Sequence, residues 1–253
     1  RMLTSPVAFL RGSAVVMAAD LATTPVTGIP VQMCGDAHLS NFGTYATPER
    51  NQIFDLNDFD ETLPGPWEWD VKRLAASIVV AGRQNGFSAA STRQATLHCL
   101  QTYRERMWEL GDMGHLDVWY SSVDAGRLLK QVSRVNRPFL TRELARAQRH
   151  TSVKVFPQLT RKSGGQYRIT DDPPLITRLD DNERAQWVHA LLEGYQTSLS
   201  DERRVLLNRY RVVDLAQKVV GVGSVGTHCY IALLLGSEDT DPLFLQIKEA
   251  QHS

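Results

Sequence analysis

The sequence predicts an α+β fold, with a mainly helical region over residues 1–210 followed by antiparallel strands over residues 211–253. Three observations lead to this prediction. Stretches typical of helices occupy most of the first region. Two short strand-like runs, residues 29–34 and 51–58, interrupt it. The last region has two apolar, β-branched and aromatic runs on either side of a glycine cluster, a pattern that indicates a strand, a turn and a second strand.

The composition limits the classes of protein that fit the chain. Its 253 residues are 42% hydrophobic, which is enough for one large domain or two small ones. Lys plus Arg and Asp plus Glu both number 28, so the formal net charge is zero and we expect no binding to nucleic acid or to a membrane surface. The three cysteines lie far apart and predict free thiols in a reducing cytoplasm. The oligomeric state stays open.

Capping and turn residues divide the first region into elements. The helix over residues 71–83 has Asp70 at its start as a cap and an apolar face that includes Leu74, Ile78 and Val79. Residues 61–70 are expected to form a Pro/Gly-rich turn. Residues 153–170 are expected to form a small hairpin-like insert. Further helices are expected over residues 8–22, 88–110, 140–150 and 181–209.

A group of short polar side chains follows the first strand, in the sequence CGDAHLSNFG of residues 34–43. Asp36 and Asn41 lie five residues apart in a loop between glycines, and Asp58 ends the next strand. The strand end can therefore lie beside the loop. Carboxylate and amide oxygens are ligands that Mg²⁺ prefers, and a carboxylate beside the metal can orient a hydroxyl group and accept its proton.

The spacing of these residues resembles the D-x-x-x-x-N catalytic loop of protein kinases and aminoglycoside phosphotransferases. The resemblance implies that Asp36 is the catalytic base and that Asn41 and Asp58 bind Mg²⁺, with Asp60 as a possible helper. It also implies that Asp70 caps its helix and steadies the loop. Cys34 stands where the resembled loop has a histidine.

Other side chains near the loop have less certain roles on the sequence alone. His38 can bind a phosphate, a metal or the loop backbone, and we favour the backbone. Asp55 is expected to point to the other face of its strand. We expect Arg11 to pair with a loop acid. We expect Trp67 and Trp69 to pack in the core. The alternative for the whole region is a pair of turns with solvated acids.

The glycine cluster carries a second motif. Gly221, Gly223 and Gly226 form a G-x-G-x-x-G pattern between two strand-like runs, and Ser224 can add a hydroxyl contact. Glycines allow a backbone to approach phosphates closely. Lys248 lies on the next strand, where kinases carry the lysine that pairs with ATP phosphates. A plain hairpin with an exposed lysine is the alternative interpretation.

The order of the two motifs is reversed relative to ordinary kinases, in which the glycine loop and the lysine come first. If both interpretations are right, the fold is a circularly permuted kinase-like fold. We then expect the chain to be a C-terminally truncated fragment. The helices that connect the two lobes, and the acidic partner of Lys248, are expected beyond residue 253.

Five stretches of the chain are similar to the DUF2252 family of bacterial proteins, whose function is uncharacterised. They are SPVAFLRGSAVVMAADLA, CGDAHLSNFGTYATPER, FDLNDFDETLPGPWEWDVKRLAAS, KVVGVGSVGTHCYIALLLG and DPLFLQIKEA. Together they span nearly the whole chain. This resemblance implies no substrate.

Three functions remain open on the sequence. The first is a phosphotransferase that uses ATP and Mg²⁺ and acts on a small-molecule acceptor. The second is a metal-dependent phosphoesterase that uses Asp36, His38, Asp55 and Asp58 with water as the nucleophile. The third is a non-catalytic nucleotide-binding module. The first function is favoured by the presence of Asp36, Asn41, Asp58 and Lys248.

Overall fold

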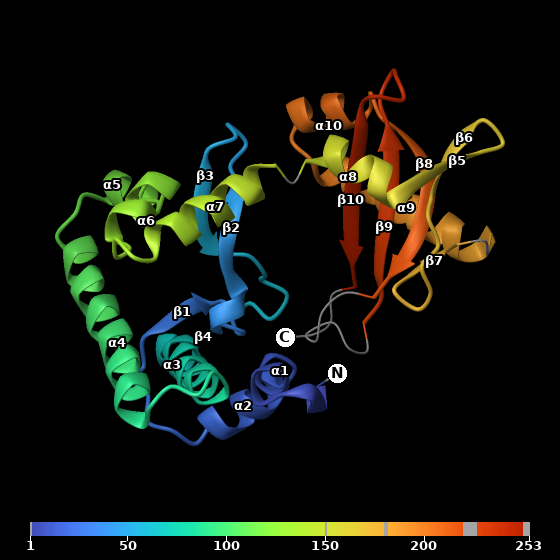
Figure 1. Ribbon diagram of the computed structural model, residues 1–253. Helices are drawn as coiled ribbons and strands as arrows, with labels where there is room; N and C mark the ends of the chain where they lie inside the picture. The colour runs from blue at the N-terminus through green and yellow to red at the C-terminus, as the bar shows by residue number, and fades with distance from the viewer. Residues whose placement is uncertain (1, 150, 180–181, 220–226, 250–253) are drawn as a thin grey trace. The chain divides into compact units, whose positions relative to one another are not determined.

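The structure is a computed structural model that describes residues 2–149, 151–179, 182–219 and 227–249. By their contacts, the described residues form two compact units, which Figure 1 shows in a ribbon diagram. Unit 1 ends at Gln148, and unit 2 begins at Arg149. The expected boundary near residue 210 therefore falls inside unit 2. Both units mix helices with antiparallel strands, which confirms the α+β class.

Unit 1 is built mainly of helices, with two short pairs of strands. β1 pairs with β4, and β2 pairs with β3, both antiparallel. The elements of unit 1, in chain order, are η1 Met2–Thr4, α1 Pro6–Arg11, α2 Ala14–Leu21, β1 Pro30–Met33, η2 Leu39–Asn41, β2 Phe42–Ala46, β3 Gln52–Leu56, β4 Leu63–Pro66, α3 Trp67–Gln84, α4 Ala89–Gly111, α5 His115–Trp119, α6 Ala125–Gln131 and α7 Arg137–Gln148.

Two local predictions for unit 1 are wrong. The helix expected over residues 8–22 is broken at Gly12 and Ser13 into α1 and α2, and a Cβ at Gly12 would lie 2.9 Å from the Met2 side chain. The turn expected over residues 61–70 contains the strand β4, although this strand carries two prolines. Proline is tolerated on an edge strand because its missing N–H can face away from the partner, and β4 has β1 as its partner.

Helix α3 buries a polar face. It begins directly after Pro66, so Asp70 lies in its first turn and is not its cap. The buried residues of α3 are Glu68, Arg73, Ser77 and Gly82, whereas the apolar residues expected to form its buried face are only half-buried. Polar groups inside a protein need hydrogen-bond partners. The partners of this face define the candidate site.

Helix α4 packs its first turns against the end of α3. A Cβ at Gly82 would lie 2.6 Å from Thr92 Oγ1, so the glycine allows the two helices to approach closely. Trp67 stacks on Tyr103 of α4, with ring centroids 5.8 Å apart.

Within the described residues, no helix combines the length and the apolar character needed to cross a membrane.

In the described part of unit 2, four strands form an antiparallel sheet in the order β10-β9-β8-β7, and β5 pairs with β6 in a separate hairpin. The elements of unit 2, in chain order, are α8 Ser152–Leu159, β5 Thr160–Ser163, β6 Gln166–Ile169, β7 Ile176–Arg178, α9 Asn182–Ser198, α10 Asp201–Leu207, β8 Arg211–Lys218, β9 Cys229–Leu235 and β10 Pro242–Lys248.

Strand β9 forms the centre of unit 2, and all its residues are buried. Alternate residues of a strand point to opposite faces, so β9 contributes to two cores. Tyr230, Ala232 and Leu234 pack with residues of α9 and α10 on one face. Ile231, Leu233 and Leu235 pack on the other face, which α8 and the β5-β6 hairpin cover. The uninterrupted apolar run of this strand reflects burial on both sides.

The two strands expected from residue 211 onward agree with β8 and β9, which pair in antiparallel register. The glycine turn expected between them lies outside the described residues. Strand β10 follows as expected and pairs with β9. The insert expected over residues 153–170 is only partly a hairpin. Its first half is helix α8, whose Thr151 cap accepts a hydrogen bond from Lys154 N, and the hairpin is β5-β6.

Candidate active site around Asp36

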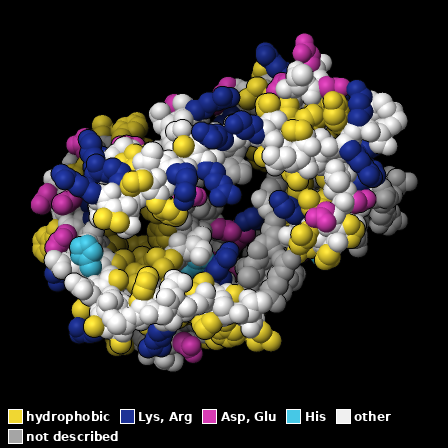
Figure 2. All heavy atoms as spheres, in the orientation of Figure 1, with side chains coloured by type: hydrophobic (Ala, Val, Ile, Leu, Met, Phe, Trp, Pro, Cys, Tyr) yellow, Lys and Arg dark blue, Asp and Glu magenta, His cyan; other side chains and the backbone are white. Residues whose placement is uncertain are grey.

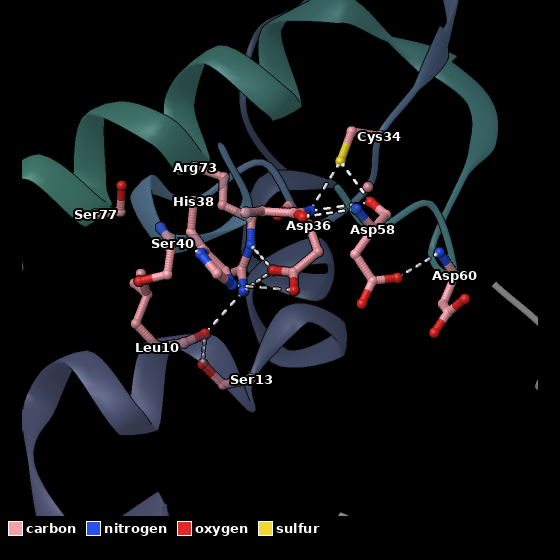
Figure 3. Close-up of polar contacts among 12 residues, drawn as sticks. Leu10, Ser13, Cys34, Asp36, His38, Ser40, Asp58, Asp60, Arg73 and Ser77 are labelled. Carbon is pink, nitrogen blue, oxygen red and sulfur yellow. Dashed lines mark hydrogen bonds and ion pairs between the residues drawn. The ribbon is translucent and has the colours of Figure 1, made fainter. Parts of the chain in front are cut away.

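Helix α3, the teal helix of Figure 3, holds the loop between β1 and η2 through hydrogen bonds. Asp70 accepts two backbone hydrogen bonds, from Cys34 N at 2.7 Å and from Gly35 N at 3.0 Å. About two turns further along α3, Ser77 Oγ accepts a hydrogen bond from Leu39 N at 3.0 Å. Both ends of the loop therefore take their position from one helix face. The predicted role of Asp70 as the acid that steadies the loop agrees with these contacts.

Gly35 is required by the backbone at this turn. Its φ is +79°, a left-handed conformation that residues with a Cβ rarely adopt. A Cβ built on Gly35 would lie 1.9 Å from the carbonyl oxygen of Glu61. The glycine thus lets the loop approach the backbone of Glu61 far more closely than any other residue would.

The carboxylate of Asp36 is bound on both oxygens. Arg73 Nε donates to Oδ1 at 2.6 Å, and Arg73 Nη2 also contacts Oδ1. On the other oxygen, His38 Nε2 lies 3.4 Å from Oδ2. His38 Nδ1 accepts a hydrogen bond from Ser40 N at 3.1 Å, so the ring proton is assigned to Nε2, facing Asp36. The favoured prediction for His38, a bond to the loop backbone, is confirmed.

Asn41 joins the loop to the end of β3. Its Nδ2 donates to the carbonyl oxygens of Asp36 at 3.1 Å and Asp58 at 3.0 Å, and its Oδ1 accepts from Asp58 N at 2.9 Å. The side chain is buried. Cys34 supports the same junction, because its Sγ lies 3.5 Å from Asp58 O and 3.4 Å from Asn41 Nδ2. The structure therefore brings Asp36, Asn41 and Asp58 together. The Cys34 thiol has a structural role, because it packs between the loop and the end of β3.

The remaining acids separate into two groups. Asp60 N donates to Asp58 Oδ1 at 3.2 Å, and Figure 3 shows both carboxylates directed away from Cys34 on the same side. Asp55 is exposed, pairs with Gly43 in the β2-β3 register and accepts a hydrogen bond from Leu56 N at 2.8 Å. Asp58 and Asp60 therefore belong to the site region, whereas Asp55 is engaged on its own strand.

The crowding of acids affects the protonation of neighbouring groups. Burial raises the pKa of the Cys34 thiol to about 11, and the charges of Asp70, Asp36 and Asp58 add to the effect. The pKa of Glu61 is raised by partial burial of its carboxyl group and by the charges of Asp36 and Asp60. Burial also raises the pKa of Asp70, although its two backbone hydrogen bonds oppose this shift. The site thus carries a negative potential that favours a cation.

The binding of Mg²⁺ stays a prediction, and the chemistry of the predicted ligands is that of an ion shared with phosphates. Mg²⁺ in proteins uses one or two carboxylates and completes its shell with phosphate oxygens and water. Asp58 and Asp60 offer two carboxylates on the same side, next to the loop of Asp36. Asn41 Oδ1 already accepts one hydrogen bond, so its ligand role would use the second lone pair. Among the described residues, no three His, Cys, Asp or Glu side chains form a metal-holding group.

The second predicted motif lies in unit 2. Gly221, Gly223, Ser224 and Gly226 fall outside the described residues. Lys248 is exposed at the end of β10 and pairs with Cys229 at the start of β9. The end of β8, the start of β9 and Lys248 therefore lie at the same end of the sheet. The role of this motif in phosphate binding stays a prediction.

Glu249 directly follows Lys248, the last residue of β10. Its Oε2 accepts hydrogen bonds from His228 N and from His228 Nδ1, both at 2.7 Å. The hydrogen bond from the His228 backbone is the main reason that the pKa of Glu249 lies below its usual value. Glu249 is thus engaged with His228.

The sequence did not predict the roles of Arg73, Ser77 and Asn57. Arg73 and Ser77 follow Asp70 at spacings of three and seven, which places all three on one face of α3. This spacing of polar residues, in a helix otherwise rich in alanine and valine, is the feature of the sequence that could have predicted a buried polar face. Asn57 N donates to Asn41 O at 2.9 Å, and a Cβ at Gly43 would lie 2.1 Å from the Asn57 amide, so this contact needs the glycine.

Three expectations for neighbouring side chains have different outcomes. Arg11 Nε is buried without a hydrogen-bond partner, and in the described part of the chain its expected pairing with a loop acid is not found. Trp67 packs as expected, against Tyr103, and its Nε1 donates to Thr27 Oγ1 at 3.0 Å. Trp69 is half-buried.

The whole chain, residues 1–253, matches the model of one protein family, described as "Uncharacterized protein conserved in bacteria (DUF2252)". This match confirms the family resemblance read from the five stretches. The comparisons with curated proteins and with solved structures gave no match. The resemblance to kinases therefore rests on the motifs alone.

Proposed function

The chain belongs to the DUF2252 family, and from the geometry around Asp36 we propose that it is a phosphotransferase that uses ATP and Mg²⁺. The observation that carries the proposal is the Asn41 side chain, which binds the backbones of Asp36 and Asp58 together. An acid loop and a second acid are thereby held side by side, as phosphoryl transfer from a metal-bound nucleotide requires.

In the proposed reaction, Asp36 orients the acceptor hydroxyl group and accepts its proton. Asp58 holds Mg²⁺, with Asp60 and Asn41 as further ligands. When bound, the ion supplies charge compensation for the phosphate oxygens. The acceptor is proposed to be a small molecule. We also propose that the segment with Gly221, Gly223, Ser224 and Gly226 covers the nucleotide and that Lys248 contacts its phosphates, in a permuted kinase-like fold.

Two contacts favour this function over a metal-dependent phosphoesterase. The phosphoesterase would use His38 and Asp55 as metal ligands. His38 instead accepts a backbone hydrogen bond on Nδ1 and faces Asp36 with Nε2. Asp55 is exposed and engaged with its own strand. Within the described residues, neither side chain belongs to a metal-holding group with Asp58.

The test is the formation of ADP from Mg·ATP, with and without an extract of bacterial small molecules as the source of acceptor. We expect Asp36→Asn to lower kcat by about 10²–10⁴-fold, because the acceptor proton loses its base. Asp58→Asn should lower activity and raise the Mg²⁺ concentration needed for half-maximal rate, whereas Asp36→Asn should leave that concentration unchanged.

Asp55→Asn is the matched control, since Asp55 is an exposed acid of the same hairpin. Its activity should equal that of the unsubstituted chain. Full activity in Asp36→Asn, or an unchanged Mg²⁺ requirement in Asp58→Asn, would remove the corresponding assignment.

A further inference from the structure

Arg73 is the most deeply buried charged side chain described near the site, with 2% of its surface exposed. Its guanidinium group is engaged on three sides. Nε and Nη2 contact Asp36, Nη2 also donates to Leu10 O at 2.8 Å, and Nη1 lies 3.3 Å from Met17 Sδ. Figure 3 shows Arg73 between the loop and helix α1, with Asp36 on one side and Leu10 on the other.

Burying a guanidinium group is unfavourable unless good geometry compensates for its lost hydration. A core position between α1, α2 and α3 would be more simply filled by an apolar side chain of similar volume. The planar fork of arginine, however, can bind a carboxylate and a carbonyl oxygen at fixed angles, which lysine cannot do. The contacts of Arg73 are of this kind.

Two other polar residues of α3, Asp70 and Ser77, bind the backbone of the loop. Asp70 binds the N–H groups of Cys34 and Gly35, and Ser77 binds the N–H of Leu39. Arg73 instead binds the side chain of Asp36. It takes Oδ1, His38 lies next to Oδ2, and together they fix the plane of the carboxylate.

We propose that Arg73 is a positioning residue for Asp36. It holds Oδ1 so that a lone pair of Oδ2 is directed toward the acceptor hydroxyl group. Through Leu10 and Met17 it also ties that orientation to α1 and α2. This role rests on the proposed phosphotransferase function. A displacement of about 1 Å at a reacting group can lower the rate by about 10²-fold. Replacing the planar guanidinium group of Arg73 should therefore lower the rate measurably.

The competing explanation is that Arg73 only stabilises the packing of α1, α2 and α3. The two roles give different results in a double-mutant cycle. A residue that acts through Asp36 has no effect on catalysis once Asp36 is gone. A residue that only stabilises the fold lowers the amount of active protein in either background.

The experiment measures kcat and KM for ATP from ADP formation in Arg73→Lys, Asp36→Asn and the double variant. We expect Arg73→Lys to lower kcat by about 10²-fold, with KM within about twofold of the unsubstituted value. In the Asp36→Asn background, Arg73→Lys should change the residual rate by less than about twofold. Arg83→Lys, at an exposed position of the same helix, is the matched control and should have full activity.

A second variant covers the case in which Arg73→Lys is poorly folded. Arg73→Ala should regain at least about tenfold in kcat when guanidinium ion is added at concentrations below those that unfold the chain, because the ion can occupy the vacated position beside Asp36. Methylammonium ion, which has no fork, should not restore the rate.

Equal losses of rate from Arg73→Lys in both backgrounds, or a loss confined to KM, would overturn the positioning role and leave the phosphotransferase function standing. Failure of guanidinium ion to restore Arg73→Ala, with the variant folded, would do the same. Absence of ADP formation by the unsubstituted chain would overturn the phosphotransferase function, and the positioning role with it.

Discussion

At the scale of single residues, the contacts of Cys34 show how a thiol can occupy the position at which the resembled loops have a histidine. Its Sγ contacts the carbonyl oxygen of Asp58 and the amide of Asn41, so it fills a scaffold position between two backbone segments. A thiol is a weak donor and acceptor, but the position is buried and needs little more than contact. The substitution leaves the loop in place.

The raised pKa of Cys34 predicts an unreactive thiol. With a pKa of about 11, about a thousandth of the thiol is ionised at pH 8, against about a tenth at the ordinary value of 9.0. We expect iodoacetamide at pH 8 to leave Cys34 unmodified in the folded chain and to modify it in urea, as peptide mass spectrometry would show. Cys99, which is half-buried on α4, is the internal comparison and should react faster.

The same shift gives a direction for the pH dependence of stability. The folded pKa lies above the unfolded value of 9.0, so the unfolded chain releases the thiol proton first as the pH rises. The contribution of Cys34 is therefore complete below pH 9 and is lost between pH 9 and about pH 11. Cys34→Ser should flatten that part of the stability curve. Rapid alkylation of folded Cys34 at pH 8 would contradict both expectations.

At the scale of elements, the loop 34–41 and helix α3 form one structure. The sequence predicted the loop, the helix and the closeness of Asp58, because glycines, polar spacing and a strand end are local signals. It did not predict that Arg73 and Ser77 of α3 are buried, because hydrophobicity predicts burial of the apolar side chains instead. Where a helix supports a polar loop, hydrogen bonding decides which face is buried.

The close approach of the loop to the backbone of Glu61 predicts a large effect of Gly35→Ala. The left-handed φ alone costs about 1–3 kcal/mol for a residue with a Cβ, and the clash with Glu61 O adds to it. Gly86→Ala is the matched control, since Gly86 has a φ of +73° but nothing within 4 Å of a Cβ. Urea denaturation should show a larger loss of unfolding free energy for Gly35→Ala than for Gly86→Ala.

Equal losses for the two alanine variants would mean that the loop can move away from Glu61 at no cost in free energy. The site geometry described around Asp36 would then be one of several available to the loop.

At the scale of the whole molecule, each unit has its own interior of a different kind. The interior of unit 2 is apolar and centred on β9, a segment that the sequence predicted to be a strand. The interior of unit 1 near the site is polar and centred on Arg73. The division between the units was not predicted at residue 148, because helices lie on both sides of it and the change to strands comes much later in the chain.

Leu233→Ala tests whether the units are separate in stability. Leu233 is fully buried in the core that α8 covers, so its truncation should lower the unfolding free energy of unit 2 by about 2–5 kcal/mol. Hydrogen exchange should accelerate at the amides of β9 and β10 while those of Gly35 and Leu39 keep their rates. Leu206→Ala, at an exposed position of α10, is the control. Equal acceleration in both units would indicate a single cooperative unit.

The polar face of α3 has a consequence for how the sequences of the loop and the helix evolve. The sequence of the loop does not determine its conformation without the helix, because Asp70, Arg73 and Ser77 supply partners that the loop lacks. Residues 34–41 transferred alone to another scaffold would lose that conformation, whereas a transfer that includes residues 67–84 would keep it. Substitutions in the loop and on this face of α3 should therefore be accepted in pairs, so that the two segments diverge together.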